Sequence, residues 1–143
     1  KFASSTNTSG DTTETIAHTL AVGTNAPSGF TLSVRGQTLT SQQNALNTVS
    51  QIGASFASST PGTEQFCLRA TVSGVTGGAV SSPFSAPTSY VYNATATTSA
   101  TLATGVGSTP TSTYSLRYLA NIAAVTEAGT YAANLVYVAT ANF

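Results

Sequence analysis

The stretch TEAGTYAANLVYVATANF, residues 126–143, decides the fold class of this chain. From Gly129 onward its residues alternate with the period of two that is typical of a β-strand. One face carries Tyr131, Ala133, Leu135 and Tyr137, and the other carries Ala132, Val136 and Val138. We therefore expect one extended strand from Gly129 to the end of the sequence.

Apolar residues on both faces of this strand indicate that both faces are covered, as in the centre of a sheet. Leu135 and Val136, for example, are adjacent and must point to opposite faces. We expect this strand to be paired along both of its edges. Phe143 then serves as an anchor that fixes the register of the strand.

The same period of two recurs along the rest of the chain, between turns rich in Gly, Pro, Ser and Asn. The further strands are expected in residues 15–24, 30–36, 64–74, 89–105 and 113–125. The first two are separated by a short turn with Pro27 and Gly29, which predicts a hairpin. Six to eight short strands predict an all-β fold, an antiparallel β-sandwich of Ig-like or pilin-like type, with a small barrel as the alternative.

Two segments do not read as strands. Residues 1–15 are polar apart from Phe2 and Ala3, so we expect an N-terminal arm able to exchange between chains, followed by one β-sandwich domain over residues 16–143. Residues 37–60 hold at most one short helix or a loop with a helical turn. The spacing of three and four that favours the helix comes from Leu46, Val49, Ile52 and Phe56.

The composition limits the possible partners. Charged residues make up 6% of the 143 residues, against about 25% in ordinary proteins, and the formal net charge is zero. Without a basic surface, binding to nucleic acid or to anionic membranes is not expected, and no apolar run is long enough to span a membrane. Ser and Thr make up about a third of the residues. This uncharged surface favours self-association, and the composition suits a secreted or surface-exposed prokaryotic protein.

The residues that carry catalysis or bind metals are scarce. The chain has one histidine, His18, on the same face as Leu20, and one cysteine, Cys67, which we expect to be buried in a strand. A catalytic role for His18 would need it exposed in a cleft beside Asp11 or Glu14. His, Cys and carboxylates do not cluster, so we expect no metal, no cofactor and no enzymatic activity.

Two other motifs concern the surface. The triplets NTS at Asn7 and NAT at Asn93 are possible N-glycosylation sites. All six tyrosines fall in expected strands. Tyr90 and Tyr92 are the candidates for an exposed sugar-binding platform, whereas the alternation places Tyr118 and Tyr137 toward the core.

Three stretches together carry a resemblance: HTLAVGTNAPSGFTLSVRGQTLTS, PGTEQFCLRATVSG and TYSLRYLANIAAVTEAGTYAANLVYVATANF. Their layout resembles a group of uncharacterised secreted surface proteins of bacteria, especially of small-genome candidate lineages. This resemblance implies an extracellular location and no assigned activity. The terminal AGTYAANLVYVATANF also resembles the last strand of β-sandwich pilin subunits. That likeness implies a filament in which one subunit completes the sheet of its neighbour.

We therefore expect a structural subunit of an extracellular filament, pilus or surface array, a homopolymer built by strand addition and Thr/Ala-rich packing. Its expected interface residues are Phe2, Ile16, Leu135, Val136, Val138 and Phe143. The alternative is a cell-surface adhesin or carbohydrate-binding β-sandwich, with host or cell-surface glycans as partners.

Overall fold

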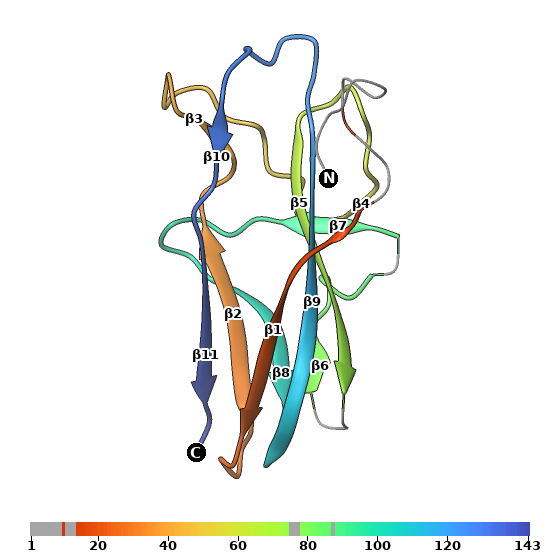
Figure 1. Cartoon of the computed structure of the whole chain (residues 1–143), viewed down its shortest axis with the longest axis vertical. Coiled ribbons are helices and arrows are strands. Elements are labelled where there is room, and N and C mark those ends of the chain that lie inside the picture. Colours follow the sequence, from red (N-terminus) through yellow and green to blue (C-terminus); the bar gives the residue numbers. More distant parts are fainter. Residues whose placement is uncertain (1–9, 11–13, 75–77, 87) are drawn as a thin grey trace.

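The computed structural model describes Gly10 and residues 14–74, 78–86 and 88–143, without the side chain of Phe56. In this part of the chain all regular structure is β-strand, which confirms the predicted all-β class (Figure 1). The strands are β1 (Ile16–Thr24), β2 (Phe30–Gly36), β3 (Thr40–Ser41), β4 (Gly53–Ala57), β5 (Gln65–Gly74), β6 (Gly78–Val80), β7 (Tyr90–Tyr92), β8 (Ala100–Gly105), β9 (Thr109–Asn121), β10 (Tyr131–Ala132) and β11 (Leu135–Ala141).

The strands form two main sheets, which run along the long axis of the molecule (Figure 1). Sheet A has the order β1-β9-β5-β7-β4, and sheet B has the order β11-β2-β8-β6. A third pair, β10 with β3, lies beyond the end of the β11–β2 pair. All pairings between these strands are antiparallel, as predicted for a β-sandwich.

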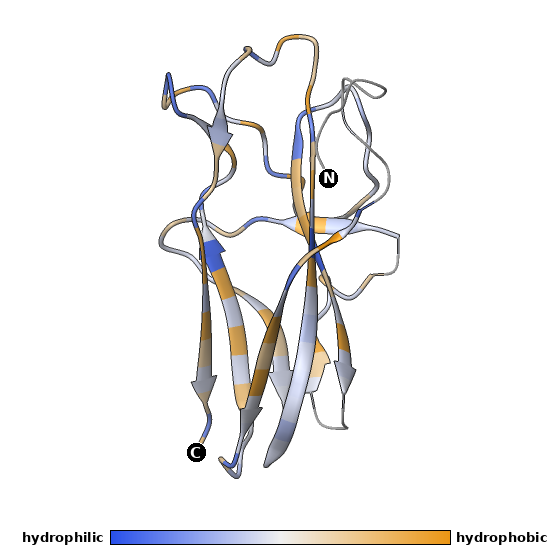
Figure 2. Ribbon diagram, in the orientation of Figure 1, coloured by the Kyte–Doolittle hydropathy of each residue, from blue (hydrophilic) through white to orange (hydrophobic). Residues whose placement is uncertain are grey.

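The core lies between the inward faces of the two sheets, because alternate residues of each strand point into it. Phe30, Leu32 and Val34 of β2 are at most 2% exposed, and the alternation is visible as bands along β2 in Figure 2. Tyr114 and Leu116 of β9 face them from sheet A and are fully buried. Burying such side chains contributes about 1.5–3 kcal/mol each.

The predicted hairpin of residues 15–24 and 30–36 is wrong. β1 pairs with β9 in sheet A, whereas β2 pairs with β8 and β11 in sheet B. The connecting turn crosses between the layers, and its Ala26 is 1% exposed. Gly29 has a φ of +86°, and a Cβ there would lie 1.9 Å from the carbonyl oxygen of Gly105. Alternation is identical for a hairpin and for a crossover, so the local pattern cannot distinguish them.

The predicted single strand from Gly129 is also wrong in its pairing. The chain breaks at Ala133 and Asn134, and the two parts, β10 and β11, belong to different sheets. β11 lies at the edge of sheet B and pairs only with β2 among the described strands, so it is not a central strand. The alternation itself is confirmed, since the residues predicted to face inward are half-buried and those predicted to face outward are exposed.

The segment 37–60 contains no helix. It forms β3, a series of turns and β4. Val49 is buried and Ile52 is half-buried, but Leu46 is 90% exposed, so the helical spacing does not describe one buried face. The backbone of this segment instead bonds to its neighbours, as in the hydrogen bond from Val49 N to Leu39 O of 2.9 Å.

Candidate functional site: an open seam between two sheet edges

Two sheet edges lie next to each other on one side of the molecule. β1 is the edge of sheet A and β11 is the edge of sheet B, and neither pairs with the other (Figure 1). We call the gap between them the seam. It is lined by the inward-facing side chains of the two strands: His18, Leu20 and Val22 from β1, and Leu135, Tyr137 and Ala139 from β11.

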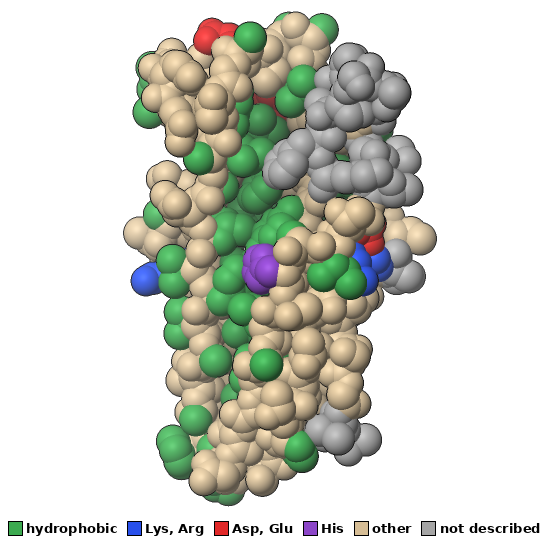
Figure 3. Space-filling view, viewed as in Figure 1, with side chains coloured by type: hydrophobic (Ala, Val, Ile, Leu, Met, Phe, Trp, Pro, Cys, Tyr) green, Lys and Arg blue, Asp and Glu red, His purple; other side chains and the backbone are tan. Residues whose placement is uncertain are grey.

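The seam contains an apolar groove of about 530 Å³. Its walls are mainly hydrophobic and aromatic, and its lining comprises His18, Leu39, Phe66, Tyr118, Tyr131, Ala132, Ala133, Leu135 and Tyr137. Figure 3 shows the groove as a band of hydrophobic side chains between the two columns of strands, with the single histidine at its margin. Part of the core is therefore open to solvent at this place, because half-buried residues such as Leu135 and Tyr137 pack on it.

An aromatic cluster bridges the seam at mid-height. The ring of His18 stacks on Tyr118 at 5.6 Å between centroids and meets Tyr137 edge-on at 5.8 Å. The hydroxyls of Tyr118 and Tyr137 form a hydrogen bond, so a residue of sheet A is tied to a residue of sheet B. Burial raises the pKa of both tyrosines. This arrangement confirms the inward direction predicted for Tyr118 and Tyr137 and makes the cluster a structural bridge.

The hydrogen bonds on the two sides of β2 show which backbone groups of β11 point away from the sheet. Asn142 N donates to Gly29 O at 2.8 Å, so the backbone of residue 142 points toward β2. On the other side of β2, Gly36 N donates to Thr95 O at 2.9 Å, so residue 36 points away from β11. The register between β11 and β2 is uninterrupted, and backbone groups alternate along a strand. The N–H and C=O groups of Tyr137 and Ala139, together with those of Ala141, therefore point outward.

β11 lacks the features with which proteins protect exposed edge strands. Natural edges carry Lys or Pro, contain bulges, or are very short. β11 has seven residues with no charge, no Pro and no register shift. The other edge strands are protected, since β6 has three residues, β4 contains a register shift, and β1 contains a register shift near each end. Among the described edges, β11 is therefore the best template for another strand.

Most of the residues predicted for a subunit interface lie on these two edges. Leu135 is half-buried in the groove. The others are exposed by 39% or more: Ile16 52%, Val136 45%, Val138 39% and Phe143 91%. Phe2 falls outside the described residues. The structure thus brings Leu135, Val136 and Val138 together on β11, with Phe143 two residues beyond it and Ile16 at the start of β1.

Of the two glycosylation candidates, Asn93 lies in the described part of the chain. Asn93 directly follows β7 and is exposed, so its amide is accessible to modification. Asn7 lies outside the described residues. The predicted sugar platform of Tyr90 and Tyr92 is wrong, because Tyr90 is 3% exposed and Tyr92 is fully buried. Tyr92 donates to Gly36 O inside the core at 3.2 Å.

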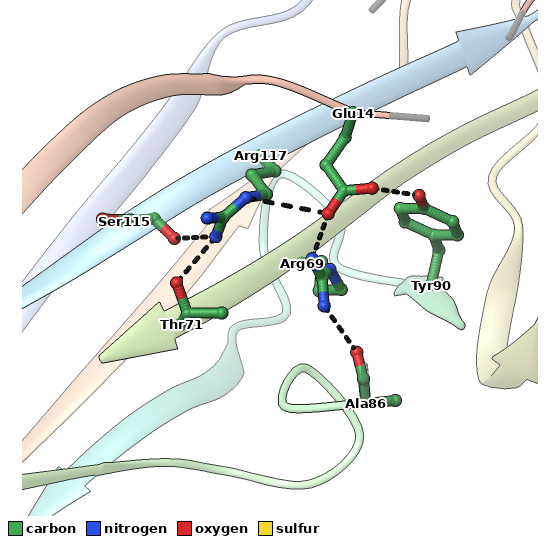
Figure 4. Close-up of polar contacts among 7 residues, drawn as sticks. All are labelled: Glu14, Arg69, Thr71, Ala86, Tyr90, Ser115 and Arg117. Atoms are coloured by element: carbon green, nitrogen blue, oxygen red, sulfur yellow. Dashed lines mark hydrogen bonds and ion pairs between the residues drawn. The ribbon is translucent and has the colours of Figure 1, made fainter. Parts of the chain in front are cut away.

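A polar cluster on the outer face of sheet A was missed by the sequence analysis (Figure 4). Arg69 of β5 and Arg117 of β9 are in-register partners, and like charges placed opposite each other destabilise a sheet. Glu14, just before β1, binds Arg69 in a salt bridge, lies 3.7 Å from Arg117 Nε, and accepts a hydrogen bond from Tyr90. Its side chain is 13% exposed. Glu14 thus offsets two adjacent cations and fastens the start of β1 to its own domain.

The pKa of Glu14 reflects this environment. Burial acts to raise the pKa, but the hydrogen bonds from Tyr90 and Arg69 and the charge of Arg69 outweigh it, so the pKa of the carboxyl is lowered. Gly10 also lies against sheet A, because a Cβ there would come within 1.9 Å of Asn121 Oδ1. Where it is described, the segment before β1 therefore contacts its own chain.

Cys67 is buried, as predicted. It belongs to a small second core with Tyr90 and Leu119, and its Sγ lies 3.2 Å from Leu119 O. Burial raises the pKa of this thiol to about 12, so it is protonated at neutral pH and a poor nucleophile.

The described residues that were weighed for catalysis or metal binding lie apart from one another. His18 contacts Tyr118 and Tyr137, whereas Glu14 is engaged by Arg69 and Arg117, so these two do not form a pair. Among the described residues no three His, Cys, Asp or Glu side chains come together as a metal site. The same part of the chain has no helix long and apolar enough to cross a membrane.

Comparisons of the chain with protein families, with curated proteins and with solved structures found no match.

Proposed function

We propose that this chain is the structural subunit of an extracellular homopolymer, a filament, pilus or surface array, that assembles by strand addition. The observation that carries the proposal is the free edge of β11, which is unprotected and borders an apolar groove. Backbone groups at such an edge supply affinity, and the adjacent groove supplies pockets for alternate side chains of the added strand.

The composition supports the same proposal. Zero net charge removes the long-range repulsion between identical copies. The surface rich in Thr, Ser and Ala suits close packing of one subunit against the next. A secreted location fits this composition and the single, buried Cys67, which needs no reducing compartment.

The proposal is tested by a matched pair of proline variants. In Ala139→Pro the lost N–H points outward, and proline is tolerated at such edge positions, so the fold remains. In Thr140→Pro the lost N–H points toward β2, so the free energy of unfolding falls by about 2–3 kcal/mol. Electron microscopy and light scattering should show assemblies for the wild type and monomers for Ala139→Pro.

Two outcomes would contradict the proposal. Wild-type protein that stays a monodisperse monomer at high concentration, with no filaments or arrays, would remove the assembly function. Assemblies of Ala139→Pro that equal those of the wild type would show that the edge of β11 is not the place of strand addition. Thr140→Pro is the control. Its loss of stability checks that the N–H of residue 140 points toward β2 and that the N–H of residue 139 points outward.

A carbohydrate-binding surface module is the second candidate, because one observation favours it. The groove in the seam is lined by Tyr118, Tyr131 and Tyr137 together with His18, and aromatic rings bind the apolar faces of sugars. This is a different set of rings from the buried Tyr90 and Tyr92. A glycan screen on monomeric Ala139→Pro tests this candidate, and the lack of any binder would leave only the assembly function.

A further inference from the structure

The question that follows from the proposed function is which strand pairs with the free edge of β11. The described strand on the other side of the seam, β1, is held in place. β1 is paired with β9, and Glu14 fastens its start to Arg69 and Arg117, so β1 cannot leave sheet A without breaking these contacts. Among the described strands with a free edge, β11 of a second copy is the one that is both unprotected and free to pair.

The charge and chemistry of β11 suit pairing with itself. Residues 135–143 contain no charged side chain, so two identical strands placed side by side meet no like-charge repulsion. Val136, Val138 and Phe143 in this segment are exposed and hydrophobic. Leu135 and Tyr137 are half-buried and line the groove. A twofold interface uses the same surface on both subunits, which is what one self-complementary edge provides.

Size complementarity and the outward backbone groups select a register. Odd-numbered residues of β11 carry the free N–H and C=O groups, so an added antiparallel strand pairs odd residues with odd residues. A twofold axis at Ala139 pairs all of residues 135–143 and places Tyr137 opposite Ala141. It also places Phe143 opposite Leu135. The large ring of Tyr137 thus meets a methyl group, and the exposed Phe143 covers the open end of the groove.

We infer that the seam is an interface between two copies of this chain, formed by antiparallel pairing of β11 with β11 about Ala139. This inference rests on the proposed assembly function and names its first contact. The two four-stranded B sheets become one continuous sheet of eight strands. The axis is perpendicular to that sheet, so both A sheets lie on the same side of it. The open seam of one copy then faces the open seam of the other.

The twofold pairing is closed, so a polymer cannot grow through β11 alone. A twofold contact uses up the β11 edges of both copies and yields a dimer. Growth beyond the dimer then requires a second surface, away from the seam. The dimer is therefore the building block of the assembly.

Two matched cysteine variants test the pairing and its register. Ala139 and Ala141 are both exposed alanines on the same face of β11. About the proposed axis the two copies of position 139 are opposite each other, with about 5.5 Å between their Cα atoms, which is within disulfide range. The Cα atoms of the two copies of position 141 are about 14 Å apart, which is too far for a disulfide. Cys67 is buried and gives no background.

The wild type should be a dimer in sedimentation at micromolar concentration. Ala139→Cys, treated with oxidised glutathione, should run as a covalent dimer on non-reducing gels, while Ala141→Cys stays monomeric there. Cross-linking of Ala141→Cys alone, or of neither variant, would overturn the inference. Electron microscopy separates it from the proposed function. Dimers that never form larger assemblies would support the seam interface and contradict the proposed polymer. Polymers in which Ala139→Cys does not cross-link would support the polymer and contradict this interface.

Discussion

The two strands that border the seam, β1 and β11, are alike in composition but differ in the contacts that fix them in the fold. β1 contains register shifts near both ends, and the residue before it, Glu14, is bound by Arg69 and Arg117. β11 has an uninterrupted register with β2, and it is tied to sheet A by the hydrogen bond between the hydroxyls of Tyr137 and Tyr118 and not by a salt bridge. Both strands lack Lys, Arg, Asp and Glu, and most of their residues are exposed. The chain thus fixes one edge of the seam and leaves the other as a regular template.

This difference shows how an uncharged sandwich can be specific about where it associates. Without lysines on its edge strands, the chain relies on bulges, short strands and side-chain anchors to protect three of the four edges of the two main sheets described. The remaining edge is the one beside the groove. Breaking the anchor of β1 should change folding stability, whereas adding protection to β11 should change association.

The largest effect on stability is expected from Glu14→Gln. The substitution leaves Arg69 and Arg117 opposite each other without a counter-charge, so the free energy of unfolding should fall by about 2–3 kcal/mol at pH 7. The lowered pKa of Glu14 gives the pH dependence. Its ionised form stabilises the fold above its ordinary pKa of 4.5, and this stabilisation is lost as the pH falls from there through the lowered folded value. Chemical denaturation across this range measures it.

Glu127→Gln is the control for that experiment, because Glu127 is exposed and its carboxylate accepts a hydrogen bond from the neutral side chain of Asn47. Its effect should stay within about 0.5 kcal/mol. The difference in the free energy of unfolding between the wild type and Glu14→Gln should become smaller in acid. A difference that stays constant from pH 7 to pH 2, or that is as small as that of Glu127→Gln, would show that Glu14 does not anchor β1.

A smaller effect on stability, but a large one on association, is expected from Val138→Lys. Val138 is 39% exposed on the outer face of β11, so the free energy of unfolding should change by about 0.5 kcal/mol or less. In the proposed pairing the two lysines lie near each other across the twofold axis, and the dimer should weaken by about tenfold or more. Sedimentation at low salt measures the dissociation constant.

Val125→Lys is the matched control, since Val125 is 85% exposed and follows β9, away from the seam. It adds the same charge and should leave association unchanged. Equal weakening by both lysines would show that net charge controls association and would remove the distinction between β1 and β11. High salt should restore association of Val138→Lys in part, because salt screens the repulsion.

The sequence predicted most of the long strands but not their partners. Residues 89–105, expected as one strand, contain β7 and β8, which belong to different sheets. Alternation predicted strands over residues 30–36 and 64–74 and the inward face of residues 131–138 correctly, because alternation along a strand is a local property. The hairpin of β1 and β2 was wrong because pairing is decided by distant strands such as β9. The helical spacing around Leu46 failed because a loop can bury Val49 and Ile52 without burying a whole face.

The site was predictable only in part for the same reason. Val136 and Val138 were expected in a central strand covered on both faces, whereas both are exposed, and the place of their strand at the edge depends on the order of sheet B. From the sequence, Glu14 was interpreted as an ordinary charged residue in a polar arm. Its role depends on Arg69 and Arg117 being in register, and these residues are separated from it by 55 and 103 positions in the sequence. The aromatic cluster of His18 and Tyr137 likewise joins the two ends of the chain.

Amide hydrogen exchange of β11 in the monomer and in the assembly tests the central claim most directly. The amides of Val136, Val138 and Thr140 point toward β2 and should exchange slowly in both states. The amides of Tyr137, Ala139 and Ala141 should exchange fast in monomeric Val138→Lys and slowly in the assembled wild type. Equal, fast exchange of these three amides in the assembly would contradict strand addition at β11.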